Sequence, residues 1–298
     1  MGYGTYSLTN RNTRAATAGY YTKSADEIFM NDLHEQMKSV GIEIREARDS
    51  VEHPDSKAII IALDVTGSMG VIPHRLIKSG LPNIMKNILE KGIKDTQVLF
   101  LAIGDHKCDK APLQVGQFES SDELMDKWLE KTWLEGGGGG NDGESYMLAW
   151  YFASKHTAID CFEKRQEKGL LISIGDDKVH REIPGNAIKE IMGNGEFPDI
   201  LNSINLLADA QKMYDVHHIN MLDWLGSNEK VKNDWKELMG DNIHHAETPE
   251  DVINKIADIC INKYRTTVKA KVVNKVRKKK SRKFCNESKS CHRFRIWG

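Results

Sequence analysis

The chain has 298 residues, of which 40% are hydrophobic and 29% are charged, and its formal net charge is −1 at pH 7. It is therefore long and apolar enough for one large domain with extensions or for two small domains. Its apolar runs are shorter than the ~20 residues of a membrane-spanning helix, its first residues show no signal-peptide segment, and its five irregularly spaced cysteines exclude a disulfide framework. We therefore expect a cytoplasmic protein without a membrane span.

Residues 1–57 are predicted to form an N-terminal arm. Within it, the segment 24–41 begins with a capping box, Ser24 with Glu27, continues with an apolar stripe and ends at a glycine. We therefore expect one amphipathic helix in the arm, followed by a charged connector.

From residue 58 onward, predicted strands and helices alternate. Three long apolar runs, at 58–64, 96–105 and 169–177, are typical of strands buried on both faces of a parallel sheet. The run 112–119 comes soon after the second of these and predicts a short antiparallel edge strand. Shorter strands are predicted near the C-terminal end, and helices between the strands.

This alternation predicts an α/β fold of the doubly wound, Rossmann-like type, with a mostly parallel sheet, one antiparallel edge strand and helices on both faces. We expect this domain to cover residues 58–266. The last predicted helix, 248–264, has threonine at its cap and proline at its first position. Residues 267–298 then form a separate tail.

The tail is strongly basic. Residues 263–298 contain 14 Lys and Arg against one Glu, a net charge of +13, which leaves −14 for the remainder. Such a tail can bind nucleic acid or an acidic protein surface, fold back on the body, or keep the protein in solution, and these alternatives stay open. Its densest part is the cluster of Arg277, Lys278, Lys279, Lys280, Arg282 and Lys283.

Polar side chains follow the first predicted strand at once. Asp64, Thr66 and Ser68 are each separated by one residue, and residues two apart on extended backbone point the same way. These three side chains can therefore converge on one small object, either a hard cation or a phosphate.

Further acidic residues are predicted at the same rim, because ligands of open α/β sheets lie beyond the carboxyl ends of the strands. Asp105 follows the second long strand and Asp176 with Asp177 follows the third. A glycine-rich loop that precedes a helix carries Asn141, Asp142, Glu144 and Ser145. Oxygen ligands from carboxylates, hydroxyls and an amide suit Mg²⁺, Mn²⁺ or Ca²⁺ and not zinc.

This combination resembles a von Willebrand factor type A (vWA) domain with its metal-ion-dependent adhesion site, from about residue 57 to 265. The first motif of that family, Asp-x-Ser-x-Ser, stands here as Asp64-Val65-Thr66-Gly67-Ser68, and the later family aspartate corresponds to Asp176. Many members have a threonine after two glycines as the middle ligand. Here Asn141 follows the glycines, and the stretch resembles a variant with a downstream glutamate, Glu144, so both remain candidates.

The resemblance implies a binding module and not an enzyme. A bound Mg²⁺ or Mn²⁺ would keep a coordination position for an Asp or Glu of a protein partner, because Mg²⁺ takes six oxygen ligands. Relatives of this kind commonly work in multiprotein assemblies or beside AAA+ ATPases, so we expect such a partner. The implied metal ligands are Asp64, Thr66, Ser68, Asn141, Glu144 and Asp176. The residues expected to face the partner are Asp105, Asp142 and Asp177.

A rival resemblance points to haloacid dehalogenase-like phosphotransferases, with Asp64 as the phosphorylated nucleophile and Mg²⁺ bound nearby. Phosphatases of that type usually carry a second aspartate two residues on, and here that place is held by Thr66. Their lysine is not evident either, so this remains the alternative function.

The loop after the second long strand holds a further group of possible ligands. Asp105, His106 and Asp109 lie within five residues. We expect them either to form a second metal site or to line the first.

Overall fold

The structure is a computed structural model, and it describes residues 4–67, 69–136, 143–193, 195–222 and 229–265. In this part of the chain, no helix is both long and apolar enough to cross a membrane.

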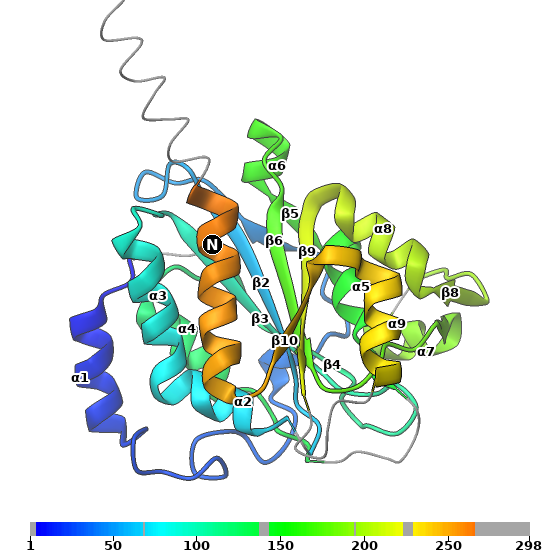
Figure 1. The fold of residues 1–298 in the computed structure, drawn as a ribbon, viewed down its shortest axis with the longest axis horizontal. Coiled ribbons are helices and arrows are strands. Elements are labelled where there is room, and N and C mark those ends of the chain that lie inside the picture. Colours follow the sequence, from blue (N-terminus) through cyan, green and yellow to red (C-terminus); the bar gives the residue numbers. More distant parts are fainter. Residues whose placement is uncertain (1–3, 68, 137–142, 194, 223–228, 266–298) are drawn as a thin grey trace, which may run out of the picture.

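A six-stranded sheet forms the centre of the molecule (Figure 1). Its strands follow the order β10-β9-β6-β2-β3-β4, and every neighbouring pair is parallel except β3 with β4. The predicted mostly parallel sheet with one antiparallel edge strand is thus confirmed. The strands are β2 (Lys57–Asp64), β3 (Thr96–Ile103), β4 (Leu113–Val115), β6 (Gly169–Gly175), β9 (Tyr214–Met221) and β10 (Ile243–Ala246).

Helices cover both faces of the sheet, because successive strand residues point to opposite sides. In β2, Ile59, Ile61 and Leu63 join one apolar core, while Ala58 and Ile60 join the other. The first core is covered by α2 (Val71–Arg75), α3 (Leu81–Glu90), α4 (Asp122–Glu130) and a final helix at 249–265. The second is covered by α5 (Met147–Lys155), α7 (Gly185–Met192), α8 (Ser203–Met213) and α9 (Glu229–Met239).

Small elements complete the fold. Strand β1 pairs in parallel with β5, and β7 pairs antiparallel with β8. These elements are β1 (Arg45–Ala47), β5 (Thr157–Ile159), α6 (Asp160–Arg165), β7 (Glu182–Pro184), β8 (Ile200–Asn202) and the 3₁₀ turn η3 (Gly240–Asn242).

The arm differs from its prediction. The helix expected at 24–41 is wrong: this segment consists mainly of turns and one 3₁₀ turn, η1 (Glu35–Met37). The Ser24 amide does donate to the Glu27 carboxylate, over 2.8 Å, but these two residues only close a local turn. The helix of the arm is instead α1 (Leu8–Ala18), capped by Ser7.

Ion pairs attach α1 to the domain, since its sequence offers little apolar surface. Arg11 is fully buried, and its guanidinium lies 3.2 Å from the carboxylate of Asp126 in α4. Arg14 contacts the same carboxylate at 2.7 Å and that of Asp122 at 2.7 Å. A buried arginine paired in this way holds the helix in one place, because breaking such a pair leaves an uncompensated charge.

Arg11 also donates hydrogen bonds to backbone carbonyls in the helical segment that follows β2. Between α2 and α3, the five residues Leu76–Gly80 form a π-helical turn, η2. Pro82 has no N–H, so the carbonyl of Lys78 four residues earlier lacks its normal helical donor. The Arg11 guanidinium donates to this carbonyl at 3.3 Å and also to that of Ile77.

Candidate metal centre

Asp64 ends the central strand β2, which lies between β3 and β6. Asp64 is paired with Ile103 of β3, and Leu63 is paired with Ile174 of β6. Asp105 and Asp176 each stand two residues beyond these partners, at the carboxyl edge of the sheet. The strand register therefore brings the three strand-end acids to one rim, where α/β sheets bind their ligands.

The Asp64 carboxylate is buried and held at both oxygens. Its Oδ1 accepts from the backbone amide of Thr66 at 2.9 Å and from the Thr66 hydroxyl at 2.6 Å. Its Oδ2 accepts from the hydroxyl of Tyr146 at 2.6 Å. The Asp64 and Thr66 side chains thus lie together, in a local turn that aspartate commonly forms with the backbone two residues on.

Tyr146 is a site residue that sequence reasoning missed. Its ring packs against His218 and Trp235, with ring centroids 5.1 and 5.6 Å away. A Cβ added to Gly175 would lie 1.9 Å from the Tyr146 hydroxyl, so only glycine fits at the end of β6. A glycine inside an apolar strand often marks such a close approach, and this was the one sequence signal for it.

Glu144 brings a second buried carboxylate to the rim. Its amide donates to the carbonyl of Lys178 at 2.8 Å, and its carbonyl accepts from the amide of His180 at 3.1 Å. Its Oε2 is buried and accepts no hydrogen bond from the described part of the chain. A buried polar atom without a partner is costly unless a ligand satisfies it.

The acids at this rim raise each other's pKa values. Burial raises the pKa of Asp64 to about 7, and the negative charge of Asp176 adds to this, against the hydrogen bonds from Thr66 and Tyr146. Burial likewise raises the pKa of Glu144 to about 9, with further contributions from the charges of Asp64 and Asp105. Without a cation, both carboxyl groups therefore tend to keep their protons near neutral pH, and a bound cation would favour their charged forms.

The predicted ligands divide into two groups. Asp64, Thr66, Glu144 and Asp176 are described, and the other three are each connected to Asp64: Thr66 donates a hydrogen bond to it, the charge of Asp176 raises its pKa, and its own charge raises the pKa of Glu144. Ser68, Asn141 and Asp142 lie outside the described residues, as does the basic cluster from Arg277 to Lys283. The described oxygen donors suit Mg²⁺, and the orphaned Glu144 oxygen is consistent with a bound cation.

Of the residues expected to face a partner, Asp105 and Asp177 are described, and they differ in exposure to solvent. Asp105 is fully buried, which removes it from that group. Asp177 is partly exposed, and its carboxylate accepts from the amide of Lys178 at 2.7 Å. Its charge also raises the pKa of Glu144, but by less than burial and the charges of other acids do.

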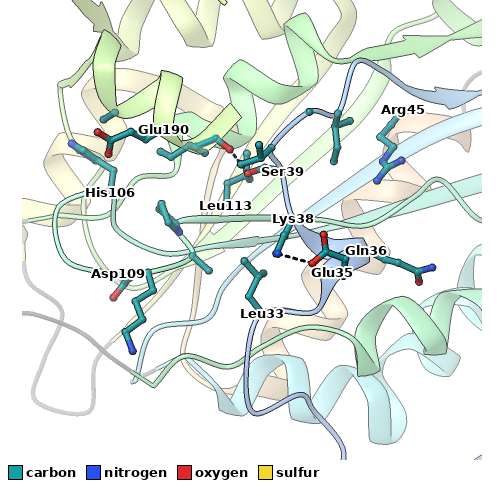
Figure 2. Close-up of a pocket in the computed structure, with 18 of the residues that line it drawn as sticks. Leu33, Glu35, Gln36, Lys38, Ser39, Arg45, His106, Asp109, Leu113 and Glu190 are labelled. Carbon is teal, nitrogen blue, oxygen red and sulfur yellow. Dashed lines mark hydrogen bonds and ion pairs between the residues drawn. The ribbon is translucent and has the colours of Figure 1, made fainter. Parts of the chain in front are cut away.

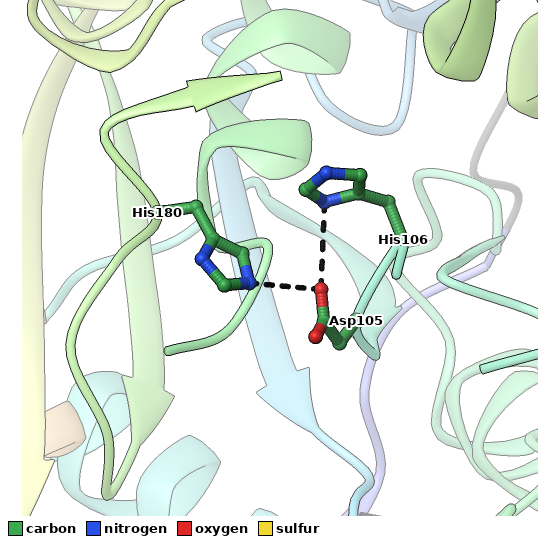
Figure 3. Close-up of side chains that lie close together, drawn as sticks. All are labelled: Asp105, His106 and His180. Atoms are coloured by element: carbon green, nitrogen blue, oxygen red, sulfur yellow. Dashed lines mark hydrogen bonds and ion pairs between the residues drawn. The ribbon is translucent and has the colours of Figure 1, made fainter. Parts of the chain in front are cut away.

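A second group of ligand-type side chains lies beside these acids. Asp105, His106 and His180 each offer one ligand atom, and the three atoms lie within 4.8 Å of one another (Figure 3). The sequence interpretation had placed Asp109 with Asp105 and His106. Instead, the Asp109 carboxylate accepts from the Asp105 amide at 2.6 Å, and His180 from the loop after β6 completes the group.

A pocket of about 960 Å³ opens next to this group (Figure 2). It is lined by the arm between residues 33 and 45, by parts of the loop 106–113 and by residues of α7. His106, Asp109 and Glu190 are among the residues at its wall.

No protein-family model and no curated protein matches the sequence. Several solved structures match 70% of the chain. The pilus adhesin SpaC from Lactobacillus rhamnosus GG has 11% identity and a TM-score of 0.45, and the vWF domain of the type V pili tip protein Mfa5 from Porphyromonas gingivalis has 13% and 0.44. Proximal thread matrix protein 1 from the mussel byssus, with a zinc-occupied MIDAS motif, has 11% and 0.43.

The match spans 30% of the length of SpaC, 48% of the thread matrix protein and 95% of the Mfa5 domain. The fold class of the present chain is defined by its own strand order and register.

Proposed function

We propose that the chain is a vWA-like protein-binding module that docks a partner through a metal ion. The ion is Mg²⁺ or Mn²⁺ at the end of β2, and an Asp or Glu of a protein partner completes its coordination. The proposed ligands are Asp64, Thr66 and Ser68, with Asn141 or Glu144, and Asp176 directly or through water.

The excess of buried carboxylate at the rim carries this proposal. Asp64 and Glu144 are both buried, and the charge of the first raises the pKa of the second. A divalent cation between them would supply the missing positive charge and a partner for the free Glu144 oxygen. The hydroxyl of Thr66, 2.6 Å from Asp64, adds a neutral oxygen of the kind that Mg²⁺ accepts.

The residue two places after Asp64 disfavours the phosphotransferase alternative. Phosphatases of that type carry an aspartate there as the general acid and base. In this chain Thr66 occupies the place, and its hydroxyl donates to Oδ1 of Asp64 at 2.6 Å. A threonine hydroxyl is a poor general acid or base at neutral pH.

Calorimetric titration of Mg²⁺ tests the metal. Wild type is expected to bind one Mg²⁺ and Asp64→Ala none, while the exposed control Asp258→Ala binds as wild type does. Equal heats from wild type and Asp64→Ala would end the proposal. A phosphatase activity that Asp64→Asn abolishes would establish the alternative instead.

The basic tail provides a second, independent contact in this proposal. A metal-bound rim in a body of charge −14 selects a single acidic side chain of a protein partner, such as an AAA+ ATPase or a multiprotein assembly. A broadly acidic protein surface or nucleic acid would instead bind through the tail of charge +13. Pull-downs with the full chain and with a chain ending at Thr266 separate the two contacts. Chelator is expected to abolish the first and salt to weaken the second. Loss of the same partners, with the same salt dependence, from the truncated chain and from Asp64→Ala would contradict this.

A further inference from the structure

Asp105, His106 and His180 have the spacing of ligands to one metal ion (Figure 3). Oδ1 of Asp105 lies 2.9 Å from Nε2 of His180 and 3.4 Å from Nδ1 of His106. Ligands ~2.0–2.1 Å from a tetrahedral zinc ion are ~3.3 Å apart. One ion therefore fits between these atoms after small side-chain movements.

The donor set differs in chemistry from that of the rim. Two imidazole nitrogens and one carboxylate suit Zn²⁺ and similar transition ions, whereas Mg²⁺ prefers oxygen alone. Asp105 is fully buried and the two histidine side chains are each 5% exposed. We propose that these three residues form a second metal site, for Zn²⁺ or a related divalent transition ion, separate from the magnesium site.

The surrounding contacts hold the three side chains in place. The Ser145 hydroxyl donates to Oδ1 of Asp105 at 3.1 Å and accepts from the backbone amide of His106 at 2.9 Å. Its 2.7 Å contact with Nδ1 of His106 has to open when that nitrogen binds the ion. His180 is held through its amide, which donates to the carbonyl of Glu144. Gly143 permits this approach, because its φ is +128° and a Cβ there would lie 3.0 Å from the Lys178 carbonyl. Ligands fixed by such contacts lose little entropy on binding a metal.

The positive charge of Lys107 lies close to His180 and disfavours a bound metal ion. Its Nζ lies 3.2 Å from Nδ1 of His180. A lysine ammonium only donates, so without metal Nδ1 accepts and the Nε2 proton of His180 is directed at Asp105. Metal binding at Nε2 moves the ring proton to Nδ1, where it meets the ammonium. Lys107 is exposed and can turn into solvent, but its positive charge lowers the affinity.

The pocket beside the arm borders the proposed site at His106. His106 is part of the pocket wall, so the third ligand of the site borders a space of about 960 Å³. Three protein ligands leave a tetrahedral ion one further position, which water or a small anion from this pocket would fill.

Titration of Co²⁺ into the full chain, with Mg²⁺ in excess to fill the rim, tests the site. Tetrahedral Co²⁺ with nitrogen ligands absorbs visible light strongly, whereas Co²⁺ in an octahedral oxygen site absorbs weakly. We expect one strongly absorbing Co²⁺ per chain, displaced by Zn²⁺. His106→Asn and His180→Gln should weaken binding at least tenfold.

Asp64→Asn should leave the Co²⁺ signal intact, which separates this site from the proposed magnesium site. His217→Gln is the matched histidine control, because Nδ1 of His217 lies 3.1 Å from Nε2 of His244 in a second histidine pair. Loss of the signal in either of these variants, or its retention in both His106→Asn and His180→Gln, would overturn the assignment.

Lys107→Met keeps the test decisive if a histidine variant unfolds, since Lys107 is exposed. Removal of the opposing charge should tighten Co²⁺ and Zn²⁺ binding by ~5-fold. An unchanged or weaker affinity would overturn the proposal, as would a wild type that takes up only weakly absorbing Co²⁺.

Discussion

Asp64→Asn is expected to stabilise the metal-free protein at pH 8. The substitution keeps the shape of the side chain, so the Asn carbonyl can still accept from Thr66 and the amide can donate to the Tyr146 oxygen. It removes a negative charge that burial makes costly. Mg²⁺ is expected to offset most of this advantage, because it binds the wild type and not the variant.

The size and pH range follow from the pKa of Asp64. Burial raises this pKa from 3.8 to about 7 in the folded protein. The folded state therefore binds more protons than the unfolded state between these pH values, and stability falls as the pH rises through them. At 1.4 kcal/mol per pH unit the cost approaches ~4 kcal/mol above pH 7, and it is absent below about pH 4.

Urea denaturation from pH 4 to pH 8 in the presence of chelator measures this effect. We expect the advantage of Asp64→Asn to grow from near zero at pH 4 to ~2–4 kcal/mol at pH 8, since Glu144 shares part of the proton affinity. Saturation of the wild type with Mg²⁺ at 100 times its dissociation constant should return ~2.7 kcal/mol. A variant that is less stable than wild type throughout this pH range in the presence of chelator would refute the reasoning.

Three further substitutions test the supports of the site and of the arm. Gly175→Ala places a methyl group where the neighbouring tyrosine hydroxyl lies, and thermal denaturation should show a loss of ~1–3 kcal/mol together with weaker Mg²⁺ binding. Arg11→Met leaves the buried Asp126 with one cation fewer, so urea denaturation should show a loss of ~3 kcal/mol, and an unchanged midpoint would contradict the role of the pair. Although burial opposes it, the hydrogen bond from Arg165 holds the pKa of Asp49 at about 2, below the 3.8 of the unfolded chain. Asp49→Asn should therefore cost ~1 kcal/mol at pH 7, after solvent screening, and the difference should vanish as the pH falls from 4 to 2; a constant difference would exclude this titration.

The parallel sheet was predictable because its strands are long and apolar on both faces. In β2, β3 and β6 the apolar runs continue until the strand ends, which left only the order of the strands to infer. The sequence predicts a helix after the glycine-rich loop, but it does not predict that every residue of α5 from Met147 to Ala153 is buried. It packs between the sheet and α8, a position that its own sequence does not reveal.

Other parts depend on contacts between distant segments. The helix α1 has no apolar stripe, and its buried Arg11 is explained only by Asp126, which lies 115 residues later. His180 joins Asp105 because the loop after β6 pairs with Glu144, and no local spacing encodes that. The strand-end acids, by contrast, follow directly from where apolar runs stop.

The π-helical turn at Leu76–Gly80 ties the start of the chain to the segment that follows the rim. Helix α2 begins at Val71, immediately after the loop that starts at Asp64, and the carbonyls near Pro82 depend on Arg11 for their donor. A chain that starts after the arm would therefore leave those carbonyls without the guanidinium. We therefore expect a fluorophore-labelled peptide that carries α1 to bind a chain without the arm through these carbonyls and through Asp126. Its binding would report on the segment that follows Asp64.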